Sequence, residues 1–458
     1  MNSATAVAPK VCQDVTRALV ERALAIDYTR LPEDVRTLAR QCLLDWFAVT
    51  LAGIGDPLVE LLLDAAREEG GTAAATVVGR GVQLTRAQAA LVNGTASHVL
   101  DYDDVNLNIN GHPSAVLVPA VLAMAEATDA PGSELLSAFV AGYEAACRAG
   151  RLAAPGHYLR GYHATSTVGG LGAAVACARL LRLDAERTAM ALGIAATEAA
   201  GLKAMFGTQC KPFHAGMAAE HGIRAALLAQ RGMQSRTDAL ECRQGFAQVL
   251  SPDLDPQAAL GDPEAYFIRD NLFKYHAACY GTHSAIECAR TLRAEHRFAP
   301  DEIESVTVRV ERGADAVCNI ASPRTGLEAK FSLRLTTAMA LCGRDTADLA
   351  VYSESTAADP VLVGVRDRIR MELIEGWPLM QTEVALGLRG GRRLVTACDT
   401  GIPSADYARQ GTRLQEKFVR LTRPVLGAER SARLLERLNA IECTRVRELM
   451  RVAGEAVQ

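Results

Sequence analysis

The chain has 458 residues, about three times the common domain size of roughly 150 residues, so two or three domains and a large core are expected. Hydrophobic residues make up 49% and charged residues 22%, which argues against disorder. The net charge is −4 with the two signs interspersed, so the sequence lacks the basic stripe that nucleic-acid binding needs.

Apolar runs in the sequence are too short for a membrane span. The run at residues 115–127 is interrupted by Pro119 and Glu126, whereas a bilayer requires about 20 apolar residues. The N-terminal segment MNSATAVAPKVCQD lacks the charged region and leucine-rich core of a secretory signal. We therefore expect a cytoplasmic protein that binds neither membranes nor nucleic acid.

The first half of the chain has helical periodicity. Pro32 opens an apolar pattern that stops at Gly53, which predicts a helix with proline at its first position. Small residues that let helices approach closely favour a compact multi-helix domain. Further helical segments rich in alanine and glycine are predicted at residues 85–100, 115–127, 133–150, 169–181 and 185–200.

After about residue 300 the pattern becomes that of strands. Val306, Val308 and Val310 alternate with polar residues, and a second alternating pair flanks the turn at residues 389–392. Helical patterns are predicted at residues 327–341, 360–368 and 405–457. The predicted fold is mainly α: an all-helical domain at residues 1–270, completed by 405–458, and a smaller α+β domain at 271–404.

Twelve cysteines contain no C-x-x-C pair, and most of them lie in apolar helical runs. This distribution predicts reduced, buried thiols, with neither a disulfide framework nor a zinc site. Cys279 is the exception, because Lys274, His276 and His283 lie within five residues of it.

The segment at residues 93–114, NGTASHVLDYDDVNLNINGHPS, gathers three aspartates and two histidines between two helical runs. Acid and base groups at such a boundary are what proton transfer requires, so Asp101 and His112 are candidate catalytic residues. A divalent metal at these aspartates is disfavoured, because no EF-hand spacing accompanies them. Asp103 and Asp104 have the alternative of capping backbone amides of the loop.

Lysine is rare in the chain, with six residues among 49 basic ones. Lys211 stands before a Gly/Ala-rich helix in QCKPFH, and Lys274 stands in FKYHAAC. Either ammonium could hold a substrate carboxylate, or exchange a proton if burial lowers its pKa. A solvated or ion-paired lysine is the alternative.

Several segments resemble signature blocks of the MmgE/PrpD family, in the expected order over nearly the whole chain. The blocks are NGTASHVLDYDD and GHPSAVLVPAVLA, GYHATSTVGGLGAA, CKPFHAGMAAEHG, FKYHAACYGTHSAIE and EAKFSL. The family includes 2-methylcitrate dehydratase, cis-aconitate decarboxylase and iminodisuccinate epimerase. The resemblance implies a large helical domain, a smaller α+β lid domain, a homodimer, and catalysis without metal or organic cofactor.

Site residues implied by the resemblance are Asp101, His112, His163, Lys211 and Lys274, lining a pocket between the two domains. In the lid segment, Cys279 stands where the decarboxylase branch has histidine. Leu335 replaces a tyrosine that is common after the KFSL block, and Val105 replaces the threonine that follows DYDD in the decarboxylase. These departures argue against the decarboxylase activity, which forms itaconate, more than against membership of the family.

The family's substrates share an electron-poor carbon flanked by carboxylates, so a carbanion forms that fixed positive charge must stabilise. In a dehydration, His163 or Lys211 would be the base and His112 the acid, with Asp101 orienting a histidine. In an epimerisation, Cys279 would be a natural second base.

The other histidines are expected to have no role in catalysis. His98 and His283 lie on helical patterns and are expected to be packed or hydrogen-bonded core residues. His157 and His296 have polar, arginine-rich neighbours and are expected to face solvent.

Two catalytic functions are favoured by the sequence, and two further functions are less favoured. The first is a cofactor-free hydro-lyase that dehydrates a small hydroxy di- or tricarboxylate resembling 2-methylcitrate. The second is an isomerase that epimerises a carboxylate-bearing carbon. A decarboxylase is less favoured because of the departures at Cys279, Leu335 and Val105. A non-catalytic binding protein is less favoured because both lysines and both histidines of the loop are present.

Overall fold

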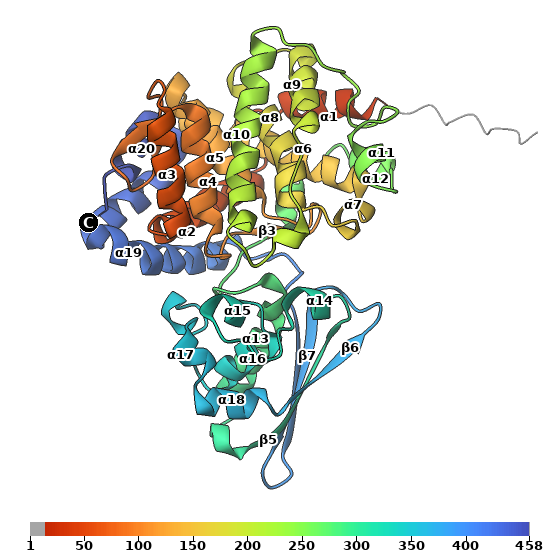
Figure 1. The fold of residues 1–458 in the computed structure, drawn as a ribbon, viewed down its shortest axis with the longest axis vertical. Helices are drawn as coiled ribbons and strands as arrows, with labels where there is room; N and C mark the ends of the chain where they lie inside the picture. Colours follow the sequence, from red (N-terminus) through yellow and green to blue (C-terminus); the bar gives the residue numbers. More distant parts are fainter. Residues whose placement is uncertain (1–13, 458) are drawn as a thin grey trace, which may run out of the picture. The chain divides into compact units, whose positions relative to one another are not determined.

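The computed structural model describes residues 14–457, which form two compact units (Figure 1). The helical unit contains the chain up to Val99, Asn106–Asn271 and the chain from Asp406 onward. The α+β unit contains Leu100–Val105 and Leu272–Ala405. The DYDD segment, residues 101–104, therefore belongs to the smaller unit. The predicted fold class, a large helical domain with a smaller α+β domain, is confirmed.

The helical unit contains the helices α1 (Val15–Leu24), α2 (Glu33–Gly53), α3 (Pro57–Glu69), α4 (Arg86–His98), α5 (Pro113–Thr128), α6 (Gly132–Ala153), α7 (Gly156–Leu159), α8 (Ala164–Leu180), α9 (Ala185–Thr197), α10 (Cys210–Gln230), α11 (Phe246–Leu250), α12 (Pro256–Leu260), α19 (Tyr407–Asn439) and α20 (Val446–Ala453). Of these, α2, α4, α5, α6 and α9 begin and end close to the predicted residues, whereas α8 begins at Ala164, before the predicted start at residue 169. The sequence did not predict the antiparallel hairpin of β1 (Ala75–Val77) and β2 (Val82–Leu84).

Glycines let the long helices of this unit approach closely, as predicted. A Cβ on Gly216 of α10 would lie 2.1 Å from the carbonyl oxygen of Leu91 in α4, and one on Gly94 of α4 would lie 2.8 Å from Cα of Gly216. Real Cβ atoms do not tolerate such distances, so any larger residue would push the two helices apart. The contact fixes the end of α4 against the start of α10.

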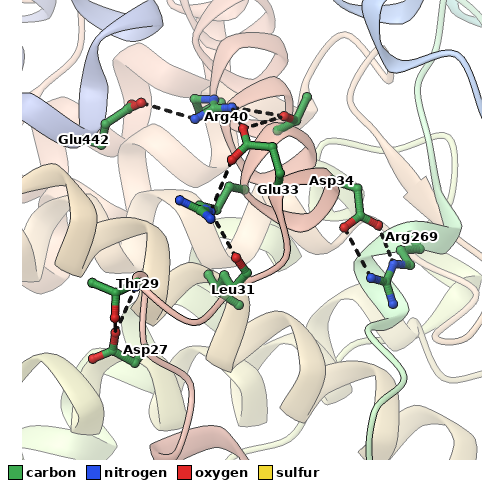
Figure 2. Close-up of polar contacts among 10 residues, drawn as sticks. Asp27, Thr29, Leu31, Glu33, Asp34, Arg40, Arg269 and Glu442 are labelled. Carbon is green, nitrogen blue, oxygen red and sulfur yellow. Dashed lines mark hydrogen bonds and ion pairs between the residues drawn. The ribbon is translucent and has the colours of Figure 1, made fainter.

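The start of α2 is tied to distant parts of the same unit (Figure 2). Pro32 is the N-cap rather than the first helical residue, which corrects the predicted start by one position. Arg40 forms ion pairs with Glu33 at 2.8 Å and with Glu442 near the C-terminus at 3.2 Å. Asp34 pairs with Arg269 at 2.6 Å.

The long helix α19 packs along α2. Lys417 of α19 and Asp45 of α2 form a buried ion pair at 2.6 Å. Among residues 14–457, no single helix is long and apolar enough to span a membrane, and only α2 with α3 meets the length and composition criteria, as a pair bent by 88°.

The α+β unit is built on a four-stranded sheet in the order β6-β5-β7-β8. β7 pairs antiparallel with β8 across the turn at residues 389–392, as the second alternating pair predicted. β7 also pairs antiparallel with β5, whereas β6 lies parallel to β5. Helices α13 and α16 pack together, and their apolar residues join the inward-facing valines of β5 in one core. The strands are β5 (Ile303–Glu311), β6 (Ile369–Ile374), β7 (Gln381–Leu388) and β8 (Arg393–Asp399).

The helix predicted at residues 327–341 is two helices, because Phe331 leaves the helical conformation and the side chain of Ser332 caps the second one. The remaining helices of the unit are α13 (His283–Glu295), α14 (Ala314–Cys318), α15 (Gly326–Lys330), α16 (Leu333–Leu341), α17 (Glu354–Ala357) and α18 (Pro360–Arg366). The two-residue strands β3 (Val105–Asn106) and β4 (Asn271–Leu272) lie where the chain passes from one unit to the other.

Candidate active site

Four histidines from four helix ends meet in the helical unit, and we call them the histidine cluster: His98, His112, His163 and His214. His98 is the last residue of α4, His112 and His163 are the N-cap residues of α5 and α8, and His214 lies in the first turns of α10. The ring of His98 lies 4.5 Å from that of His112 and 6.1 Å from that of His163, between centroids. Nδ1 of His163 lies 3.1 Å from Nδ1 of His214.

Lys211 adds a positive charge to the cluster. It precedes His214 by about one turn of α10 and is 8% exposed. Its ammonium lies 5.6 Å from the ring centroid of Phe206, whose ring packs edge-on against His163 at 4.9 Å. The starts of α5, α8 and α10 contribute the positive ends of three helix dipoles. Together these groups suit a small anionic ligand.

The electrostatic environment keeps two of the histidines neutral. Burial, followed by the charge of Lys211 and the neighbouring histidines, holds the pKa of His163 well below its ordinary value. Burial and Lys211 also lower the pKa of His214. Both imidazoles are therefore uncharged near neutral pH, which is the protonation state that a general base requires.

A second group of predicted site residues lies in the α+β unit. Nζ of Lys274 is 3.3 Å from Oδ1 of Asp101 and donates a 2.6 Å hydrogen bond to the carbonyl oxygen of the same residue. Asp101 has a φ of 52°, in the left-handed region that aspartate tolerates better than most residues. Nζ of Lys330 donates a 2.8 Å hydrogen bond to the carbonyl of Leu100. Two lysines thus hold the DYDD segment in the α+β unit.

Cys279 belongs to this second group. A hydrogen bond from the thiol of Cys318 lowers the pKa of Cys279; the charge of Lys274 acts in the same direction, and burial and Asp101 oppose it. Cys318 was not predicted as part of the site, because tertiary structure alone brings it to Cys279. The nearby His276 makes two structural hydrogen bonds. Its Nδ1 lies 2.8 Å from Oγ1 of Thr346, and its Nε2 lies 3.1 Å from Oε1 of Glu287.

The structure brings His112, His163 and Lys211 together in the helical unit, and Asp101, Lys274 and Cys279 together in the α+β unit. That both groups line one pocket stays a prediction. His98 was expected to be a core residue; it is 1% exposed, and it also belongs to the histidine cluster.

The structure overturns the expectation for His157 and adds His214 to the site. His157 was expected to face solvent, and that expectation was wrong. It is 3% exposed, contacts Oγ1 of Thr167 at 3.0 Å, and stacks on Tyr162. His214 was not singled out from the sequence, although its position three residues after Lys211 places both on one face of a helix.

Buried histidines and lysines at helix ends, in a mainly helical protein with a second α+β unit, define a class of proteins suited to acid–base chemistry on a small anion. The model of the MmgE/PrpD N-terminal domain matches residues 17–259, and that of the MmgE/PrpD C-terminal domain matches residues 276–441. The chain belongs to the MmgE/PrpD family, as its signature blocks indicated.

Curated relatives of the chain include proteins named cis-aconitate decarboxylase from several organisms. The protein from Homo sapiens is 30% identical over 341 residues, covering 70% of this chain and 69% of the relative. That from Mus musculus is 29% identical over 318 residues, covering 65% and 64%. That from Aspergillus terreus is 26% identical over 308 residues, covering 63% of each chain.

Proposed function

We propose that the protein is a lyase that acts on a small di- or tricarboxylate by acid–base chemistry, dehydrating a hydroxy acid that resembles 2-methylcitrate. The observation that carries the proposal is the buried, neutral His163, held 3.1 Å from His214 and beside Lys211. A neutral base within positive charge can take a proton next to a carboxylate while its surroundings stabilise the resulting anion.

His163 takes the proton from the carbon next to a substrate carboxylate, and the electron pair of the broken C–H bond moves onto that carboxylate as an enediolate. Lys211 and the starts of α5 and α8 stabilise this charge. His112 donates a proton to the departing hydroxyl, so the products are water and an alkene. This division of roles uses only groups within the helical unit.

The experiment is incubation of the protein with citrate, 2-methylcitrate and malate in deuterated water, followed by NMR and by alkene absorbance. Alkene formation that is lost in His163→Gln supports the proposal. Alkene formation at the wild-type rate in that variant contradicts the role of His163. No turnover with any of these acids, together with tight citrate binding, would indicate a binding protein instead.

Decarboxylation is a second candidate, favoured by the names of the relatives. Loss of CO2 from a carboxylated alkene leaves a carbanion that the same cluster would stabilise, and His112 would return a proton to carbon. Cys279, Leu335 and Val105 differ from the residues of the decarboxylase branch, and for this reason we place dehydration first. Release of CO2 from cis-aconitate, without hydration, would reverse that order.

Epimerisation is favoured by the surroundings of Cys279, where the hydrogen bond from Cys318 and the charge of Lys274 lower the pKa of the thiol. A thiolate and a neutral imidazole can remove and return a proton on opposite faces of one carbon. Deuterium incorporation into the substrate without an alkene product, abolished in Cys279→Ser, is the result that this function requires.

A further inference from the structure

His163 and His214 contact each other through the same ring atom, Nδ1, of each residue. The two Nδ1 atoms lie 3.1 Å apart, with the ring planes at 51°. His163 is 2% exposed and His214 is 6% exposed. This contact is a polar interaction between two buried rings, and it orients them relative to each other.

Two neutral imidazoles at this distance share one proton, because one Nδ1 must donate and the other must accept. If His163 donates, its Nε2 keeps a lone pair and can act as a base. If His214 donates, Nε2 of His163 carries hydrogen and cannot accept a proton. The direction of one hydrogen bond therefore decides whether His163 is a base.

We infer that His214 is a positioning residue that accepts the Nδ1 proton of His163 and thereby keeps the Nε2 lone pair of His163 available for the substrate proton. This inference rests on the proposed function. When Nε2 takes the proton, His163 becomes an imidazolium, and its Nδ1–H donates more strongly to His214. His214 then stabilises that cation, as a buried aspartate does in a catalytic triad.

The charges around the pair favour an imidazole as the acceptor. Lys211 lies one turn away on the same helix, and a carboxylate in place of His214 would neutralise it. A neutral acceptor orients His163 and leaves the field of Lys211 intact for an anionic substrate. His214 is also the less deeply buried ring, so partial positive charge costs less on it than on His163.

Three variants of α10 test the inference. His214→Asn keeps a neutral acceptor near the position of Nδ1, and His214→Phe keeps the ring but removes the acceptor. His221→Phe, two turns further along the helix at a half-buried histidine, is the control for substitution in α10. The readouts are kcat and KM for the dehydration of 2-methylcitrate, and the 15N chemical shifts of His163 in the resting protein.

We expect His214→Phe to lower kcat by about 100-fold or more with KM within about threefold of wild type, and His214→Asn to recover most of the rate. The NMR spectrum should show hydrogen on Nδ1 of His163 in the wild type and in His214→Asn. Hydrogen on Nε2 of His163 in the wild type would overturn the inference, as would wild-type kcat in His214→Phe.

The two proposals can fail separately. The tautomer of His163 is read without substrate, so a wild-type protein with hydrogen on Nδ1 and no turnover would contradict the lyase function and support the pairing. If His214→Phe fails to fold, judged by circular dichroism, the wild-type tautomer and the rate of His214→Asn still decide the inference. A large rise in KM at unchanged kcat would assign His214 to substrate binding and contradict it.

Discussion

Lys274 binds Asp101 twice, through the carboxylate at 3.3 Å and through the backbone carbonyl at 2.6 Å. Lys274 is 1% exposed, and Asp101 holds a left-handed backbone conformation. The lysine therefore both compensates a buried carboxylate and fixes the shape of the DYDD segment. A lysine so placed is held by the protein, which reduces the positive charge that it can offer to a substrate.

Asp101→Asn tests this relationship. Asparagine also tolerates the left-handed conformation, so the substitution removes the charge with little backbone strain. It deprives a buried ammonium of its carboxylate, and we expect the free energy of unfolding to fall by about 3–5 kcal/mol. Urea unfolding measures the change, and Asp101→Asn/Lys274→Met should recover part of it. A loss below about 1 kcal/mol would contradict the assignment.

Asp45→Asn is the matched control, because Asp45 and Lys417 form a buried pair at 2.6 Å within the helical unit, outside the histidine cluster. It should destabilise the protein by a similar amount and leave the kcat of the folded enzyme unchanged. Loss of kcat in Asp101→Asn alone would tie the DYDD segment to catalysis.

Lys211→Met should change the pH dependence of activity. The base must be uncharged, and the positive charge of Lys211 is one of the causes that lower the pKa of His163, after burial. Removing the ammonium raises that pKa, so the acid limb of kcat/KM moves to higher pH. The pH–rate profiles of wild type and variant measure the shift.

Lys203→Met is the control for this shift. The ammonium of Lys203 lies over the ring of Tyr158 at 3.7 Å, outside the histidine cluster, and its loss should leave the acid limb in place. An unmoved limb in Lys211→Met would show that Lys211 does not act on the base.

Local patterns in the sequence were enough to predict much of the fold. Helices with a capping residue and an apolar stripe, such as α4 behind the capping box of Thr85 and Gln88, were found to within a few residues. Strand β6 was missed because its partner β5 is distant in the chain and parallel, so no turn marks the pairing. The break between α15 and α16 at Ser332 also escaped, since the apolar pattern continues across it.

For the candidate site, the sequence predicted residue types better than their partners. His112, His163 and Lys211 were found because they stand in recognisable segments. His214 was overlooked because its proposed role depends on contact with Nδ1 of His163, and sequence periodicity does not show which side-chain atoms meet. The contact of Cys318 with Cys279 likewise depends on how α14 packs, and no spacing in the chain encodes it.

Cys318→Ala should raise the pKa of Cys279, because the thiol of Cys318 is the main group that lowers it. Cys318→Ser keeps a donor and should preserve most of the effect. Thiolate absorbance in the ultraviolet, followed against pH and corrected with Cys279→Ala, measures the titration. Equal midpoints for wild type and Cys318→Ala would show that the contact does not control Cys279.

Glu144 of α6 links ionisation to stability. Burial raises its pKa to about 7 from an ordinary value of 4.5, although the backbone N–H groups of Phe267 and Ile268 and the charge of Arg148 oppose the shift. Between these two pH values the folded protein keeps a proton that the unfolded chain has released. The stabilising contribution is therefore complete below about pH 4.5 and is lost as the pH rises through about 7.

Glu144→Gln replaces the carboxyl group with a neutral amide and should remove this dependence. Relative to the variant, the wild type should lose on the order of 3 kcal/mol of unfolding free energy between pH 4.5 and 7.5, and the variant should become the more stable protein at the higher pH. Urea unfolding across this range is the measurement, and Glu134→Gln on the same helix controls for loss of charge. Parallel stability curves for wild type and Glu144→Gln would mean that Glu144 ionises equally easily in the folded and unfolded states.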